Sequence, residues 1–159
     1  MVGAVEGPKT TSSVQEIARQ GYKYGTWVML VVIIVQFLAA GAGPFSISAS
    51  QPQATTGVRI LQYHGQVGPA IVFFLSIIMV ILGFAGRLPW RMTGIAASFI
   101  PLLILQSVFI LPYKYQHDMP ALAGMPWLAG LHVLNALFIF WLTFQWVEWT
   151  RRDLEALRR

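Results

Sequence analysis

The amino-acid sequence predicts an all-α integral membrane protein, a bundle of four transmembrane helices with both termini in the cytoplasm. Three observations lead to this fold class. Hydrophobic residues make up 56% of the 159 residues and charged residues 11%, whereas a soluble domain carries about a quarter charged residues. Four apolar stretches are each long enough to cross a bilayer core, which takes roughly 20 residues of helix. Most of the basic residues lie on one side of these stretches.

The composition also excludes several classes of protein. So few charges cannot cover a water-facing surface, which excludes a soluble enzyme, a disordered tail and a nucleic-acid-binding module. The chain has no cysteine, and this excludes disulfides, thiolate catalysis, iron–sulfur clusters and c-type haem attachment. The partner that the composition predicts is the lipid bilayer of the cell membrane, and no nucleic acid is expected.

The predicted spans cover about residues 24–43, 58–86, 92–112 and 125–147. Turn and breaker residues separate them, among them Pro44, Pro89 and Pro112. Residues 1–23 are expected to form an N-terminal tail, residues 24–148 the bundle, and residues 149–159 a basic C-terminal tail. Within the first tail, residues 13–24 are expected to form a short interfacial helix, because Ser13 and Glu16 have the spacing of a capping box.

The distribution of basic residues sets the predicted orientation. Of the 11 Lys and Arg residues, all but Arg59 and Lys114 fall before the first span, between the second and third, or after the fourth. The positive-inside rule then places both termini in the cytoplasm. Tryptophans near the predicted span ends are expected to lie in the membrane interfaces: Trp27, Trp90, Trp127, Trp146 and Trp149.

Few polar residues fall at membrane depth, where they are costly and often functional. They are Gln36, His64, Gln106, Ser107, His132 and Asn135. His64 and His132 each lie six residues inside the outer end of a predicted span, a depth of about 9 Å at the rise of an α-helix. The second and fourth spans can lie diagonally across the bundle. His117 belongs to an outer loop, where a solvated histidine needs no further role.

Two histidines at matched depth predict the axial ligands of one haem b, with iron held from both faces of the ring. Gly68 would let a flat ring lie against its helix. Arg59 and Lys114, the basic residues on the outer side, would pair with the propionates.

Asn135 lies one turn beyond His132, where it could bond a buried polar group or a neighbouring helix. Two other interpretations of the histidines stay open: hydrogen bonds between helices, and another metal or a proton relay. Zinc is disfavoured because a structural site takes four ligands, usually including cysteine.

Two segments resemble one four-helix half of haem A synthase. They are Tyr63-His64-Gly65-Gln66-Val67-Gly68 and Leu131-His132-Val133-Leu134-Asn135-Ala136-Leu137. That family holds a histidine pair on the second and fourth helices of each half, so the resemblance implies that His64 and His132 bind iron. A third segment is similar to uncharacterised four-span bacterial membrane proteins: Val35-Gln36-Phe37-Leu38-Ala39-Ala40-Gly41.

The chain departs from the synthase in two ways. The synthase has an acidic residue one turn before the second-span histidine, where this sequence has Ile60 and Leu61, and it often has a cysteine pair in the first outer loop. Synthase activity is therefore not assigned. The sequence predicts a small b-type cytochrome-like protein that transfers electrons, with a quinone, other subunits of a membrane complex or a second copy as partner. The alternative is a non-redox scaffold or accessory subunit of a larger complex. No independent catalytic activity is expected.

Overall fold

The computed structural model describes residues 12–46, 55–114 and 127–157, and within these ranges every regular element is a helix. The elements are α1 (Ser13–Ser46), α2 (Thr55–Gln62), a π-helical turn η1 (Tyr63–Val67), α3 (Gly68–Ala85), α4 (Trp90–Lys114) and α6 (Trp127–Ala156). Because α2, η1 and α3 follow one another without a break, they form one long helix. The all-α prediction is confirmed for the described ranges.

Within the described ranges, four helices are long and apolar enough to cross a membrane: Ser13–Ala42, Gly57–Ala85, Trp90–Leu111 and Trp127–Ala156. The predicted number and order of helices of this length and hydrophobicity are confirmed. In the described ranges, α3 packs against α1 and α4, and α6 packs against the same two helices, but the backbones of α3 and α6 do not approach each other. The second and fourth spans therefore lie diagonally across the bundle, an arrangement that the sequence allows.

The first helix begins with a capping box one residue before the predicted one. The Ser12 hydroxyl accepts from the Gln15 N–H at 3.3 Å, and the Gln15 side chain accepts from the Ser12 N–H at 3.2 Å. From there α1 runs unbroken to Ser46. Residues 13–24 are therefore helical and lead directly into the first span, and Ala18 and Tyr22 on this segment are buried in the bundle.

The fourth helix is also longer than predicted. It continues through most of the expected C-terminal tail to Ala156, with Thr150 and Leu154 buried. Polar contacts join this end of the bundle. The Arg19 guanidinium donates to the Gly86 carbonyl at 2.9 Å, and Arg91 forms an ion pair with Asp153. The bundle therefore begins and ends one to three turns beyond the apolar stretches.

The turn between α3 and α4 is a Schellman motif. The N–H of Leu88 donates to the Gly83 carbonyl at 3.0 Å, and the N–H of Arg87 donates to the Phe84 carbonyl at 3.0 Å. Arg87 occupies the left-handed position with a φ of 49°, where glycine is the usual residue. The motif reverses the chain tightly, so α3 and α4 lie antiparallel with Leu88 buried between them and the rest of the core.

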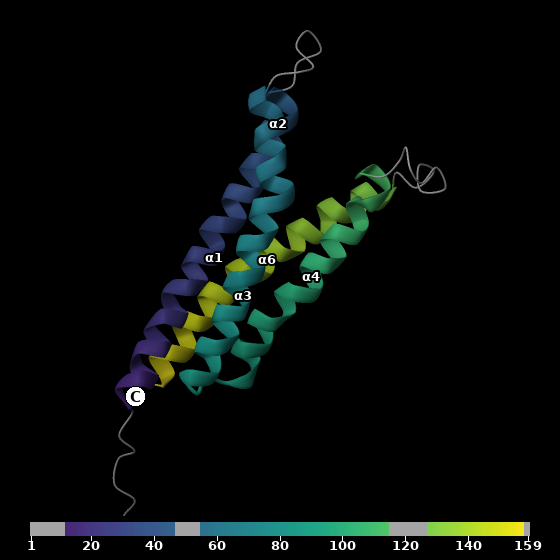
Figure 1. Cartoon of the computed structure of the whole chain (residues 1–159). Helices are drawn as coiled ribbons and strands as arrows, with labels where there is room; N and C mark the ends of the chain where they lie inside the picture. Colours follow the sequence, from purple (N-terminus) through teal and green to yellow (C-terminus); the bar gives the residue numbers. More distant parts are fainter. Residues whose placement is uncertain (1–11, 47–54, 115–126, 158–159) are drawn as a thin grey trace, which may run out of the picture.

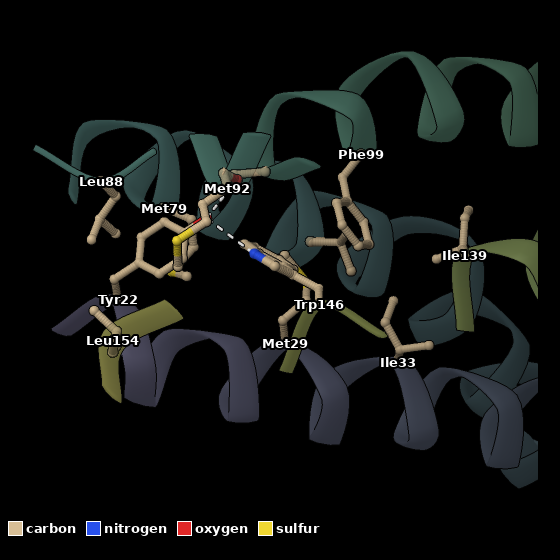
Figure 2. Close-up of a cluster of buried hydrophobic side chains, with 12 residues drawn as sticks. Tyr22, Met29, Ile33, Met79, Leu88, Met92, Phe99, Ile139, Trp146 and Leu154 are labelled. Carbon is tan, nitrogen blue, oxygen red and sulfur yellow. Dashed lines mark hydrogen bonds between the residues drawn. The ribbon is translucent and has the colours of Figure 1, made fainter. Parts of the chain in front are cut away.

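The buried core lies in the half of the bundle where α1 begins and α6 ends (Figures 1 and 2). Its members are Tyr22, Met29, Ile33, Val72, Met79, Leu88, Met92, Ala96, Phe99, Ile139, Trp146 and Leu154. The Trp146 indole N–H donates to the Tyr22 hydroxyl at 3.0 Å, and that hydroxyl donates to the Met92 carbonyl at 2.6 Å. This relay joins α6, α1 and α4 at one point.

The position of Trp146 corrects one expectation. It is fully buried, with its ring 5.3 Å from that of Phe99 and 5.8 Å from that of Tyr22. Trp146 is therefore a core residue and not an interfacial anchor. Trp27, Trp90 and Trp127 are exposed, as interfacial residues are.

We expect Tyr22→Phe to lower the free energy of unfolding by about 1–3 kcal/mol, because it leaves the Trp146 N–H and the Met92 carbonyl without this partner in a buried site. Denaturation of the full chain in detergent measures the change. Tyr24→Phe is the matched control, since Tyr24 is 64% exposed. Equal stability of the two variants would contradict the role of the relay.

In the opposite half the helices diverge. Figure 1 shows α1 with α2 and α3 leaning away from the pair α4 and α6. In the described ranges, α2 and η1 pack on α1 and make no backbone approach to α4 or α6. The bundle is thus tight at one end and splayed at the other.

Candidate functional site

His64 lies in the π-helical turn η1, and the sequence does not predict this turn. The N–H of Gly68 bonds the Tyr63 carbonyl, five residues back, in place of the four residues of an α-helix. A wide turn inserts one extra residue and rotates the side chains on one side of it relative to those on the other. Single π-turns inside α-helices often occur at functional sites. This one sets the direction in which His64 leaves its helix.

The structure brings the two predicted histidines together. The ring centroids of His64 and His132 are 6.4 Å apart, and the ring planes meet at 83°. The backbones of η1 and α6 do not approach each other, so the two imidazoles bridge the diagonal of the bundle with their side chains. The predicted convergence of the two rings at one level is present.

Both ring nitrogens of His132 contact a single residue of α4, Gln106. Its Nδ1 lies 3.0 Å from the backbone carbonyl of Gln106, and its Nε2 lies 3.0 Å from the side-chain nitrogen of Gln106. A carbonyl can only accept and an amide nitrogen can only donate. Nδ1 therefore carries the proton, and Nε2 accepts with its lone pair. The ring is the neutral Nδ1–H tautomer.

Asn135 completes this network. Its side-chain nitrogen donates to the Leu102 carbonyl at 3.0 Å and to the Gln106 side-chain oxygen at 2.6 Å. Because the Gln106 oxygen faces Asn135, the Gln106 nitrogen faces His132. These bonds join Asn135 to the neighbouring helix α4, which is one of the two contacts that the sequence predicts for it. Within the described ranges, Ser107 bonds only within its own helix, to the Leu103 carbonyl.

His64 has a different set of contacts. Its Nδ1 is buried and has no hydrogen-bond partner among the described residues. The backbone of Gln36 in α1 lies near this imidazole. Buried polar atoms without a partner are rare and call for an explanation.

The glycines near the histidines are of two kinds. A Cβ at Gly68 would collide with the side-chain amide of Gln36, so this glycine allows α1 and α3 to pack closely. The face of Gly68 that was expected to receive a flat ring is thus covered by Gln36. Next to the histidines, Gly65 and Gly130 are open, with no atom near a Cβ at either position.

The remaining predicted residues lie nearer the splayed end. Arg59 is exposed on α2, one turn before η1. Lys114 is the last residue of α4, and its side chain is outside the described part of the chain. His117, assigned to an outer loop, also lies outside the described residues. The role of Arg59 and Lys114 toward a propionate stays a prediction.

The distance between the two rings is close to that of two axial ligands on one iron, but one of the ring nitrogens is occupied. An imidazole nitrogen binds a metal at about 2 Å, so two axial imidazoles hold their ring centroids about 6 Å apart. A ligating histidine usually donates its other N–H to a carbonyl or carboxylate, as His132 does to Gln106. The Gln106 amide, however, occupies the lone pair of His132 Nε2. Iron can bind there only if this amide moves.

Other metal sites have less support. In the described ranges no three His, Cys, Asp or Glu side chains gather in a group that could hold a metal ion. A haem needs only two ligands from the protein. A shallow apolar groove runs along α3 and includes Val67, Ile71 and Phe74, but neither histidine lines it.

No family model, curated protein or solved structure matches this chain. The resemblance to haem A synthase therefore stays a prediction from the two histidine segments.

Proposed function

We propose that this multi-pass membrane protein is a small b-type cytochrome-like electron carrier that holds one haem between His64 and His132. The observation that carries the proposal is the pair of imidazoles from diagonal helices, with ring centroids 6.4 Å apart and planes at 83°. This spacing suits two axial ligands on one iron. The buried His64 Nδ1, which has no hydrogen-bond partner among the described residues, supports it further.

The residues around the pair would orient the ligands. The Gln106 backbone holds His132 through its Nδ1–H, which fixes the tautomer and the ring direction of this histidine. Bound haem b would supply one-electron transfer. With both axial positions taken by histidine, the site would suit electron transfer and leave no open position for oxygen.

The surroundings of the pair define the proposed partners. The positive-inside rule places both termini in the cytoplasm and the histidines toward the outer leaflet of the cell membrane. Arg59 and Lys114 would then be the basic residues available to the propionates at that side. The electron donor or acceptor would be a quinone, another subunit of a membrane complex or a second copy of the chain.

The absorbance spectrum of the purified protein, reconstituted with haem b in detergent, tests the proposal. We expect a Soret band in the wild type, and its loss or a shift typical of five-coordinate iron in His64→Ala and in His132→Ala. His117→Ala is the matched control, because it removes the third histidine of the chain. A protein with no Soret band, or with the same band after both replacements, would contradict the proposal.

A second function is favoured by the bonds of His132. Both of its nitrogens are satisfied by Gln106, and Asn135 ties the same glutamine to α6. This network suits a scaffold or accessory subunit in which His132 holds α4 to α6. In that case His132→Ala would lower the stability of the chain or its assembly with other subunits, and no chromophore would be found in any variant.

A further inference from the structure

A glutamine of the preceding span stands at a similar distance before each histidine. Gln36 of α1 lies 28 residues before His64, and Gln106 of α4 lies 26 residues before His132. The Gln106 backbone carbonyl accepts from His132 Nδ1 at 3.0 Å. This contact uses no side-chain atom of Gln106, so its amide is available for a different task.

The two amides differ in what they contact. The Gln36 amide lies over Gly68, on the close contact between α1 and α3. The Gln106 amide donates to the Nε2 lone pair of His132 at 3.0 Å. It is held in this place by the 2.6 Å bond from Asn135 to its oxygen. One histidine of the pair is therefore capped, and the other has a buried nitrogen without a hydrogen-bond partner in the part of the chain that the structure describes.

We infer that Gln106 is a positioning residue with two functions toward an iron ligand at His132. Its backbone carbonyl fixes the Nδ1–H tautomer, which leaves the Nε2 lone pair for a metal. Its side-chain amide caps that lone pair until the iron of haem b replaces it. The inference rests on the proposed function, since it assigns the capped nitrogen to iron.

Binding of iron at His132 Nε2 would compete with the hydrogen bond from the Gln106 amide. Iron at His132 Nε2 has to displace the Gln106 amide, and a neutral hydrogen bond contributes about 1 kcal/mol net. Removing the amide while keeping the carbonyl should therefore strengthen haem binding by about fivefold. In Gln106→Leu the backbone carbonyl remains, and Asn135 retains its bond to the Leu102 carbonyl.

Titration of the apo-protein in detergent with ferric haem b measures this effect by the Soret absorbance. We expect Gln106→Leu and the more flexible Gln106→Met to bind about fivefold more tightly than the wild type. Gln36→Leu is the matched control, because its amide caps no described ring nitrogen, and no tightening is expected there. Wild-type or weaker affinity in both Gln106 variants would overturn the inference and leave the proposed function in place.

Nitrogen NMR of the haem-free protein with labelled histidine provides a second readout. We expect His132 to show a protonated Nδ1 and a hydrogen-bonded, unprotonated Nε2. In Gln106→Leu the Nδ1 proton should stay, and the Nε2 resonance should move to that of a free lone pair. A His132 protonated on Nε2 would overturn the inference. A wild type that has these resonances but binds no haem would refute the proposed function alone.

Discussion

Replacing Trp146 with alanine should lower the free energy of unfolding by about 2–4 kcal/mol, the largest effect that we expect from a single core substitution. The indole is fully buried between Phe99 and Tyr22 and donates to the Tyr22 hydroxyl. Inside a membrane, burial of an apolar group from water adds little, so the loss comes from packing and from the missing hydrogen bond. The cavity would open at the junction of α1, α4 and α6.

Denaturation of the full chain in detergent measures this loss, and Trp90→Ala is its matched control. Trp90 is 84% exposed at the start of α4, so we expect a change within about 0.5 kcal/mol. Equal free energies of unfolding for the two alanine variants would show that Trp146 does not stabilise the core.

Gly83→Ala is expected to lower the free energy of unfolding by about 1–3 kcal/mol through overpacking. A Cβ at Gly83 would lie 2.5 Å from Thr93 Oγ1 and 3.3 Å from Thr93 Cβ. Threonine has few χ1 rotamers in a helix, and Thr93 Cβ and Cγ2 both lie 3.3 Å from the added atom, so we expect α3 and α4 to separate. A Cβ at Gly25 would clash with the flexible side chain of Met79, which can move, so a smaller loss of stability is expected there.

The same substitution at Gly41 is the control, because a Cβ there meets no other atom. We expect Gly41→Ala to be neutral or stabilising, since alanine favours a helix over glycine. A second change tests the mechanism: Thr93→Ala in the Gly83→Ala background should recover most of the loss. Failure of this rescue would show that the contact with Thr93 is not the cause.

The spans could be predicted from the sequence because a bilayer imposes length and hydrophobicity on any segment that crosses it. The helix ends could not be predicted in this way. Charged residues, which end an apolar stretch in the sequence, fall in Ser13 to Tyr22 and in Thr150 to Ala156. The apolar faces of both segments nevertheless pack inside the bundle. The same holds for Trp146. A tryptophan near a span end is predicted to lie in the membrane interface, and only the packing of the helices shows that Trp146 is a core residue.

At the candidate site the choice of histidines came from depth and spacing, and the structure brings both rings together. The π-turn was beyond prediction, because a shift of one backbone bond leaves no mark in composition or periodicity. The function of Gln106 was also missed. A signal existed in the sequence, since Gln36 and Gln106 stand at similar distances before His64 and His132. It becomes meaningful only when the backbone contacts are known.

The wide turn at Tyr63–Val67 contains one residue more than an α-helix needs to cover the same path. A homologue with a regular helix here would be one residue shorter, and its alignment to this chain would show a single gap beside His64. In that homologue, the side chains before the gap would be rotated by about 100° relative to α3. Gain or loss of this one residue during evolution would therefore turn His64 toward or away from His132 while every other residue stays the same.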